Sequence, residues 1–335
     1  MKLLSWNVFE IGNPKTELAL RDLCWKERPN IVFLMETKSN SSCLIKLQKR
    51  CGFGNGVYVD SNERTGGLCL WWRECSVELV SKSEHHIEAN VCNSNGVALW
   101  RAMGIYGWPE VENKCKTWDL MRTLKKNCTI PYIMYGDFNE ILYQTEKDGG
   151  PARRECAMEA FRSAISDCGL HDLGYKGSVF TWQRGRSIET LVRERLDRFL
   201  GDNEWCVKFP QFSVRHLVRV ASDHSPIMLD TINYFDRGKT VKLFRFEALW
   251  LSKEECSKVV KEAWTDKIGV APHDSIAGYA DSLSRWARKA FGDIKKKIRD
   301  KEKDLKDVQE GRVDARMLKR CETLAGEIHE LRRME

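Results

Sequence analysis

Short apolar runs that end in a polar side chain recur along the first two thirds of the chain. Residues 3–8 form the first run, and residues 31–35 form a continuous apolar run that ends at Glu36. Continuous apolar strands are typical of sheets with both faces covered, so these runs predict strands buried between helices. Helical spacing follows each run, in residues 15–27 and 39–50, and Pro29 ends the first helix.

Residues 56–107 change to short strand-like segments separated by turn residues. This spacing predicts an antiparallel meander. Its segments are 57–59, 67–72, 77–80, 97–100 and 103–106.

Helices and strands alternate again from residue 113. We expect helices at 113–127 and 155–168. The expected strands are 132–137, 180–182, 191–199, 212–220 and 227–229. Two successive halves of this kind predict a four-layer α/β sandwich over residues 1–232, with two mixed β-sheets packed face to face and flanked by helices.

Residues 233–335 differ in texture, and a helical C-terminal extension is expected there. Helical spacing begins near residue 243, and two apolar stripes lie on either side of Gly311, which predicts a helical hairpin. The stripes are Ile294, Ile298, Leu305 and Val308, then Cys321, Leu324, Ile328 and Leu331. Lysines 295–297 are interleaved with acids and indicate a solvated helix face, with a nucleic-acid contact as the alternative.

The composition fits a soluble globular protein, with 42% apolar and 31% charged residues in 335 and a net charge of +7. Residues 233–335 hold 24 Lys and Arg against 19 Asp and Glu, while residues 1–232 hold 31 against 29. The 13 cysteines include no Cys-x-x-Cys pair, which argues against structural zinc or a disulfide framework and for a reducing compartment. We expect no signal peptide and no membrane span.

Five of the predicted strands or loops end in groups that can bind a metal ion or orient a phosphate. Asp137 and Asn139 follow the run at 132–136 and can point the same way if the strand stays extended. Ligands collect beyond the carboxyl ends of strands in α/β sheets, so one cleft can hold all five groups. The others are Asn7, Glu36, Asp197 and the pair Asp223–His224.

The order and spacing of these groups resemble those of the endonuclease/exonuclease/phosphatase superfamily over residues 1–232. The motifs are Ser-Trp-Asn, Met-Glu-Thr, Ile-Tyr-Gly, Gly-Asp-Phe-Asn, Leu-Asp-Arg and Ser-Asp-His. Within that superfamily the chain most resembles the apurinic-type endonuclease of plant-type LINE retrotransposons. The phrases Tyr-Gly-Trp-Pro at 106–109 and Gly-Ser-Val-Phe-Thr-Trp at 177–182 carry this finer resemblance, and the helical remainder resembles the linker before the reverse transcriptase.

The resemblance implies that Glu36 is the principal metal ligand, with Asn7 and Asp223 near the ion or its waters. Carboxylate and amide oxygens without a thiolate favour Mg²⁺, with Mn²⁺ as the alternative.

It also implies that Asp137, oriented by Asn139, deprotonates the attacking water. His224 would bind the scissile phosphate, with its tautomer set by Asp197, and Tyr106 would contact the phosphate or assist the leaving group.

Two further residues are expected to contact DNA. The resemblance implies that Thr181 contacts the DNA backbone. Trp108 lies in the loop after the strand at 103–106, where it can stack on a nucleotide. Four other tryptophans, Trp6, Trp71, Trp72 and Trp182, lie in predicted strands and are expected in the core.

One segment departs from the resembling proteins. Residues 8–11 read Val-Phe-Glu-Ile where the plant-type elements usually have Cys-Arg-Gly-Leu. The segment lacks the basic side chain and carries an extra carboxylate, Glu10, which lowers the expected efficiency on DNA without changing the chemistry.

The expected function is a Mg²⁺-dependent endonuclease that nicks DNA in the nucleus and leaves a 3′-hydroxyl. The chain is not expected to copy RNA alone, since it ends without a reverse transcriptase and is a candidate truncated element. Two alternatives remain open. One is a phosphoesterase of the same superfamily acting on another phosphate ester, and the other is a decayed element fragment that serves as a binding module.

Overall fold

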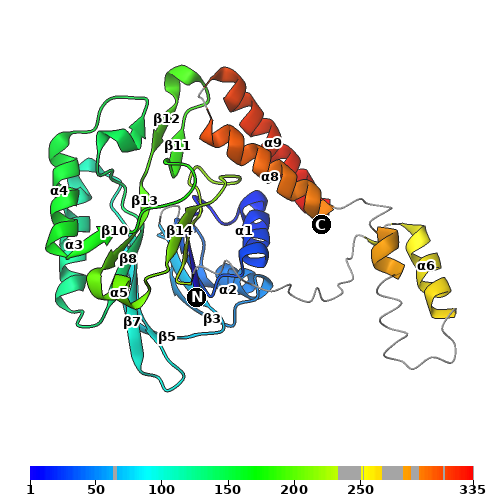
Figure 1. Ribbon diagram of the computed structural model, residues 1–335, viewed down its shortest axis with the longest axis horizontal. Coiled ribbons are helices and arrows are strands. Elements are labelled where there is room, and N and C mark those ends of the chain that lie inside the picture. The colour runs from blue at the N-terminus through cyan, green and yellow to red at the C-terminus, as the bar shows by residue number, and fades with distance from the viewer. Residues whose placement is uncertain are drawn as a thin grey trace. The chain divides into compact units, whose positions relative to one another are not determined.

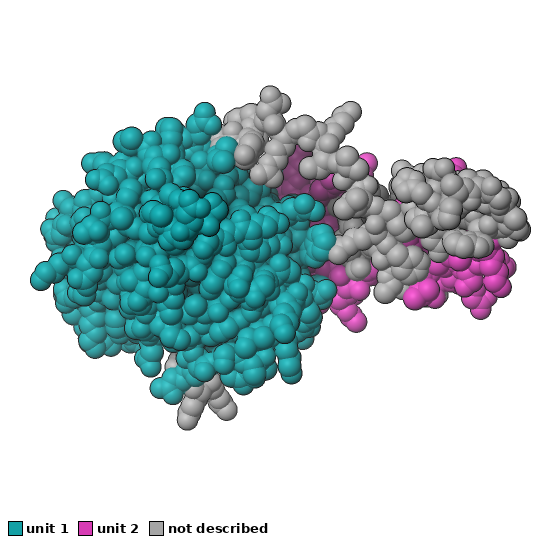
Figure 2. Space-filling model, turned by 90° about the horizontal axis from the view of Figure 1, so that it is seen from below, with its two compact units in different colours: residues 1–233, 306–322 teal, residues 234–305, 323–335 magenta. Residues whose placement is uncertain are grey.

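The computed structural model describes residues 1–62, 66–232, 250–251, 253–265, 282–287, 294–311 and 314–334. Much of the helical spacing predicted from residue 243 onward lies outside the described residues. The chain forms two compact units, one of Met1–Asn233 with Lys306–Glu322 and one of Tyr234–Leu305 with Thr323–Glu335, coloured teal and magenta in Figure 2. None of the described helices is long and apolar enough to cross a membrane.

The first sheet of unit 1 contains six strands, in which one parallel pair is flanked by antiparallel neighbours. In spatial order they are β14 (Ser213–His216), β15 (Ile227–Asp230), β1 (Lys2–Asn7), β2 (Ile31–Met35), β4 (Leu68–Trp72) and β3 (Asn55–Val59). The parallel register pairs Asn7 with Met35, so Asn7 and Glu36 leave the sheet at the same end.

The second sheet also contains six strands and again has one parallel pair, between β7 and β8. Its order is β10 (Leu170–Asp172), β13 (Asp197–Asp202), β8 (Tyr132–Asp137), β7 (Ala98–Tyr106), β6 (His86–Cys92) and β5 (Ser76–Ser83). A small third sheet is formed by β11 (Trp182–Arg184), β12 (Val192–Glu194) and β9 (Lys147–Asp148).

The two successive halves of the sequence do not correspond to the two sheets. The antiparallel meander crosses between the sheets after β4, so its first two strands belong to one sheet and β5, β6 and β7 to the other. The last two strands, β14 and β15, return to the first sheet beside β1. The predicted strand at 191–199 is two strands, and the segments at 97–100 and 103–106 are one.

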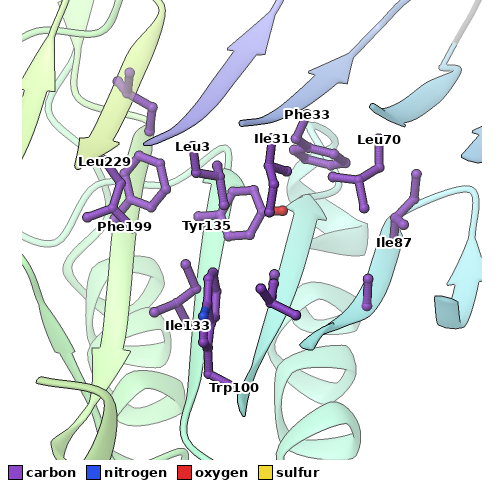
Figure 3. Packing of buried hydrophobic residues seen from close by; sticks show 14 of the residues in the cluster. Leu3, Ile31, Phe33, Leu70, Ile87, Trp100, Ile133, Tyr135, Phe199 and Leu229 are labelled. Carbon is purple, nitrogen blue, oxygen red and sulfur yellow. The ribbon is translucent and has the colours of Figure 1, made fainter. Parts of the chain in front are cut away.

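The inward faces of the two sheets pack against each other to form the central core (Figure 3). Alternation along each strand decides which side chains enter it. Leu3 of β1 and Phe33 of β2 face Ile133 and Tyr135 of β8, and the Phe33 and Tyr135 rings meet edge to face at 5.5 Å.

Helices cover the outward face of each sheet (Figure 1). Leu4 and Trp6 of β1 pack in a cluster with α1 (Pro14–Glu27) and α2 (Ser41–Arg50). Met134 of β8 packs with α3 (Lys114–Lys126) and α4 (Glu155–Asp167) on the opposite side. A short helix, α5 (Asn203–Lys208), follows β13. The predicted α/β sandwich of two mixed sheets flanked by helices is therefore confirmed.

The described residues of the C-terminal part are mostly helical, as predicted. Its helices are α6 (Glu254–Thr265), α8 (Ile294–Glu310) and α9 (Ala315–Met334). Within unit 2, Lys301 pairs with Glu327 and Arg332 with Glu302, each at 2.8 Å, so these parts of α8 and α9 lie side by side. The apolar stripes are buried at Ile298, Leu305, Leu324 and Ile328.

Gly136, the residue before Asp137, has a backbone conformation that only glycine adopts readily. Its φ is +132°, and a Cβ there would lie 2.1 Å from the carbonyl oxygen of Ile105 on β7. We predict that Gly136→Ala lowers the free energy of unfolding by at least about 2 kcal/mol, because both the strain and the clash involve backbone. Urea denaturation measures the loss.

The matched control is Gly54→Ala, since Gly54 has no positive φ and a Cβ there would have no heavy atom within 4 Å. Equal stability of the two variants would contradict this account of β8.

Candidate active site

The register of β8 places three of the predicted site residues next to one another. Asp137 pairs with Tyr106 on the parallel neighbour β7 and with Asp197 on the antiparallel neighbour β13. The three side chains therefore come from adjacent strand ends of the second sheet. Asn7 and Glu36 leave the first sheet at the corresponding end of β1 and β2.

Hydrogen bonds join these two groups. Asn7 Nδ2 donates to Glu36 Oε1 at 2.9 Å and to Asp137 Oδ2 at 3.0 Å. The Tyr106 hydroxyl also donates to Glu36 Oε1, at 3.1 Å. Carboxylates carried by different sheets thus converge on one amide nitrogen, although Glu36 and Asp137 are 101 positions apart in the sequence.

His224 completes the cluster from the loop before β15. Its Nδ1 lies 2.8 Å from Asp197 Oδ2, and its Nε2 lies 3.7 Å from Asp137 Oδ2. The loop is held by the Ser222 hydroxyl, which donates to the Asn7 carbonyl at 2.8 Å, and by Trp6 Nε1, which donates to the His224 carbonyl at 3.0 Å. The structure therefore brings together Asn7, Glu36, Tyr106, Asp137, Asp197 and His224.

Burial and the neighbouring charges shift the pKa values at the centre of this cluster. Burial raises the pKa of Asp137 to about 7; the positive charge of His224 opposes this shift, and the negative charge of Asp197 adds to it. Burial alone would lower the pKa of His224, but the charges of Asp197 and Asp137 outweigh it and raise that pKa to about 10. His224 therefore carries a proton at neutral pH. Burial, with the charges of Glu36 and Asp137, also raises the pKa of Tyr106, so its hydroxyl stays protonated.

The backbone at Asp197 is held by the hydroxyl of a buried threonine. Thr181 is fully buried, and its hydroxyl accepts the backbone N–H groups of Leu196 and Asp197, each at 3.0 Å. The Thr181 hydroxyl thus supports the backbone at Asp197, and its contact with the DNA backbone stays a prediction. Arg198, the next residue along β13, is also fully buried and pairs with Glu146 and Asp172 at 2.8 Å each.

Asn139 and Asp223 each form hydrogen bonds close to the cluster. The Asn139 backbone N–H donates to Asp137 Oδ1 at 2.8 Å, while its side chain donates to the Gly107 carbonyl at 2.8 Å. Asn139 thus orients Asp137 through its backbone. Asp223 Oδ2 accepts a hydrogen bond from Trp182 Nε1 at 3.0 Å.

Several contacts of the site have no clear signal in the sequence. Lys38 Nζ lies 3.4 Å from Glu36 Oε2 and 3.6 Å above the Phe9 ring. His85, in the turn between β5 and β6, stacks on Trp108 with ring centroids 3.5 Å apart. Its Nδ1 lies 2.8 Å from the Tyr106 carbonyl oxygen. One face of Trp108 is therefore already covered by an imidazole.

The segment that departs from the resembling proteins divides by burial. Val8 and Ile11 are buried in the cluster under α1 and α2, whereas Phe9 and Glu10 are exposed. The differences from the resembling proteins at positions 8 and 11 therefore lie in the interior. The exposed positions 9 and 10 change the surface beside Lys38.

The donor set fits a hard divalent cation. Asp137, Asp197 and His224 bring side-chain atoms within 4.8 Å of one another, and since His224 is protonated, the carboxylate oxygens are the atoms that could bind a cation. Asp197 Oδ1 is buried without a hydrogen-bond partner among the described residues. Glu36 and Asp137 share the neutral Asn7 amide, which offsets their negative charge only weakly. A cation bound by their oxygens would neutralise that charge more fully. Asp223 lies outside this donor set, because its carboxylate faces Trp182.

No protein-family model matches the chain, and no curated protein matches it by sequence. Solved structures match its fold. The 3′-5′ exonuclease NExo from Neisseria meningitidis is 17% identical, with a TM-score of 0.53 over 69% of this chain and 99% of NExo. An AP endonuclease from Archaeoglobus fulgidus is 15% identical, with a TM-score of 0.54 over 69% of this chain and 98% of that one.

The endonuclease domain of TRAS1, a telomere-specific non-LTR retrotransposon, is 14% identical, with a TM-score of 0.49 over 70% of this chain and 99% of that one. Identities this low establish the fold alone. The chain therefore shares the α/β-sandwich fold of NExo and of the archaeal AP endonuclease, in agreement with the fold that its sequence motifs predict.

Proposed function

We propose that this chain is a divalent-metal-dependent phosphodiesterase that nicks one strand of DNA and leaves a 3′-hydroxyl. The observation that carries the proposal is the buried cluster in which Asp137 lies against the His224–Asp197 pair and shares the Asn7 amide with Glu36. A general base, a protonated imidazole and a carboxylate donor set are thus concentrated in one place.

Asp137 is suited to accept the proton of an attacking water. A general base works best when its pKa is near the operating pH, and burial brings the pKa of Asp137 to about 7. Its Oδ1 is held by the Asn139 backbone N–H and its Oδ2 by Asn7, so its orientation is fixed before substrate arrives.

His224 and Tyr106 are suited to bind the negative charge that develops on the phosphate. His224 is protonated, and its Nδ1–H is held by Asp197, so Nε2–H is the donor left for a phosphate oxygen. The Tyr106 hydroxyl stays protonated and can donate to a phosphate or leaving oxygen in place of Glu36.

We propose that Glu36 and Asp137 hold the cation, with Asn7 beside it. A bound Mg²⁺ or Mn²⁺ would supply Lewis-acid stabilisation of the charge on the transferring phosphate. The proposal that Asp223 is a ligand requires its carboxylate to leave Trp182, so it is a weaker candidate than Asp137.

The structural neighbours support DNA as the substrate class. One is named an AP endonuclease and another a 3′-5′ exonuclease. The LINE-like phrases favour nicking within DNA in a nuclear setting. A Neisseria NExo variant described as a 3′ phosphatase bound to a product DNA hairpin favours a second candidate, removal of a 3′-terminal phosphate.

Substitution at the base and the imidazole should abolish nicking. We predict that Asp137→Asn and His224→Gln each lower the rate of open-circle formation from supercoiled plasmid in Mg²⁺ by about 10²–10⁴-fold, because each removes a proton-transfer or charge-stabilising group. His171→Gln, which changes an exposed histidine of β10, is the matched control and should act as wild type.

The same assay separates the alternatives. Nicking by wild type that disappears in EDTA supports a metal-dependent enzyme. DNA binding that persists in EDTA, with no nicking under Mg²⁺ or Mn²⁺, would favour a binding module. Phosphate release from a 3′-phosphorylated hairpin without plasmid nicking would favour the phosphatase.

The pH dependence of nicking should be bell-shaped. Activity should rise as Asp137 loses its proton, at or below pH about 7 since a bound cation favours its charged form, and fall as His224 loses its proton near pH 10. Asp197→Asn removes the main charge that raises the pKa of His224, so we predict that the falling limb moves to lower pH. The pH profile of kcat/KM for a single-site duplex measures both limbs.

Asp119→Asn, at an exposed position of α3, is the control for a change of charge and should leave both limbs in place. A falling limb that does not move in Asp197→Asn would contradict the role of Asp197.

A further inference from the structure

The end of α8 and the start of α9 belong to the same compact unit as the candidate active site. Gln309 of α8 contacts the loop that leads to His224 through both ends of its amide. Its Nε2 donates to the Arg219 carbonyl at 2.9 Å, and the Arg219 backbone N–H donates to its Oε1 at 3.3 Å. One side chain therefore satisfies both backbone groups of Arg219.

Arg219 in turn contacts the hairpin formed by β11 and β12. Its Nη2 donates to Gln183 Oε1 of β11 at 2.7 Å. In the described part of the chain its guanidinium forms no ion pair with a carboxylate, and burial lowers its pKa to about 10. Arg219 is thus held by hydrogen bonds to neutral amides. Gln183 binds its guanidinium, and Gln309 binds its backbone N–H and carbonyl groups.

The far strand of the same hairpin contacts α9. Leu191, just before β12, is buried in a cluster with Met317 and Leu318, and Val308 and Cys321 pack against it. The C-terminal segment therefore holds the hairpin at Leu191, where it packs directly, and at Gln183, through Arg219.

The hairpin in turn shares backbone hydrogen bonds with the residues on both sides of His224. The Gln183 N–H donates to the Asp223 carbonyl at 3.0 Å, and the Ser225 N–H donates to the Thr181 carbonyl at 2.6 Å. Trp182 forms an isolated antiparallel bridge with His224 itself. A displacement of the hairpin would consequently move His224 relative to Asp197 and Asp137.

We propose that residues 306–322 are a positioning element of the active site, and that Gln309 is a positioning residue that acts on His224 through Arg219 and the β11–β12 hairpin. The catalytic part of this inference rests on the proposed nuclease function. Its structural part, that the segment orders loop 217–224 and hairpin 182–194, does not.

Hydrogen exchange of the full chain tests the structural part. Gln309→Met keeps the side-chain volume and removes both hydrogen bonds, so we predict that amides in 217–224 and 182–194 exchange about tenfold faster, with β8 unchanged. Asp307→Asn, at an exposed position two residues earlier on α8, is the matched control and should exchange as wild type. Met317→Ala is the second variant and should speed exchange in 182–194. Unchanged exchange in both variants would overturn the proposal.

Nicking kinetics test the catalytic part. In Gln309→Met we predict about tenfold lower kcat with KM little changed, because His224 is held less firmly in the position from which it would donate to the phosphate. Faster nicking would overturn the proposal, since it would mean that the segment obstructs the site. Exchange is measured without substrate, so a wild type that does not nick would refute the proposed function and leave the exchange result valid.

Discussion

A single amide nitrogen, that of Asn7, donates to carboxylates carried by two different β-sheets. One acceptor is Glu36 at the end of β2 and the other is Asp137 at the end of β8. Two neighbouring carboxylates repel each other, and Asp137 is buried while Glu36 is partly buried. The arrangement is stable only with donors or cations between them, and the amide, the Tyr106 hydroxyl and His224 supply those donors. The electrostatics of the site follows from this constraint.

The backbone around the site is also unusual. Among the described residues, Phe9, Glu36, Lys38 and Asn139 have positive φ values of 46–60° in the loops that follow β1, β2 and β8. Non-glycine residues in this region store strain, which persists only where surrounding structure over-determines it. Gly136 adds a φ of +132° just before Asp137. Strain is thus concentrated at the strand ends that carry the candidate catalytic groups.

The sequence predicted most of the interior because burial on both faces leaves a continuous apolar run, as in residues 31–35. It did not predict that the meander divides between two sheets, since pairing partners of β4 and β5 depend on packing far along the chain. The strand at 86–92 is not among the predicted segments, although Ile87, Ala89 and Val91 alternate with polar residues. In the structure two of these polar residues, His86 and Glu88, are also buried.

At the site, motif order identified the residues that the structure brings together, but not their partners. Thr181 and Asp223 stand in the expected motifs, yet one is buried under Asp197 and the other faces Trp182. These contacts of Thr181 and Asp223 depend on the conformation of the surrounding loops, which local sequence patterns do not predict. The contact of Gln309 with Arg219 spans 90 positions and likewise has no local signal.

The most direct test of the convergence on Asn7 is a crystal structure with Mn²⁺, whose anomalous signal locates the ion. The account predicts a peak bounded by oxygens of Glu36 and Asp137, with His224 Nε2 free to face a phosphate. A peak that contacts neither carboxylate, or a structure in which these side chains point into separate regions, would contradict it.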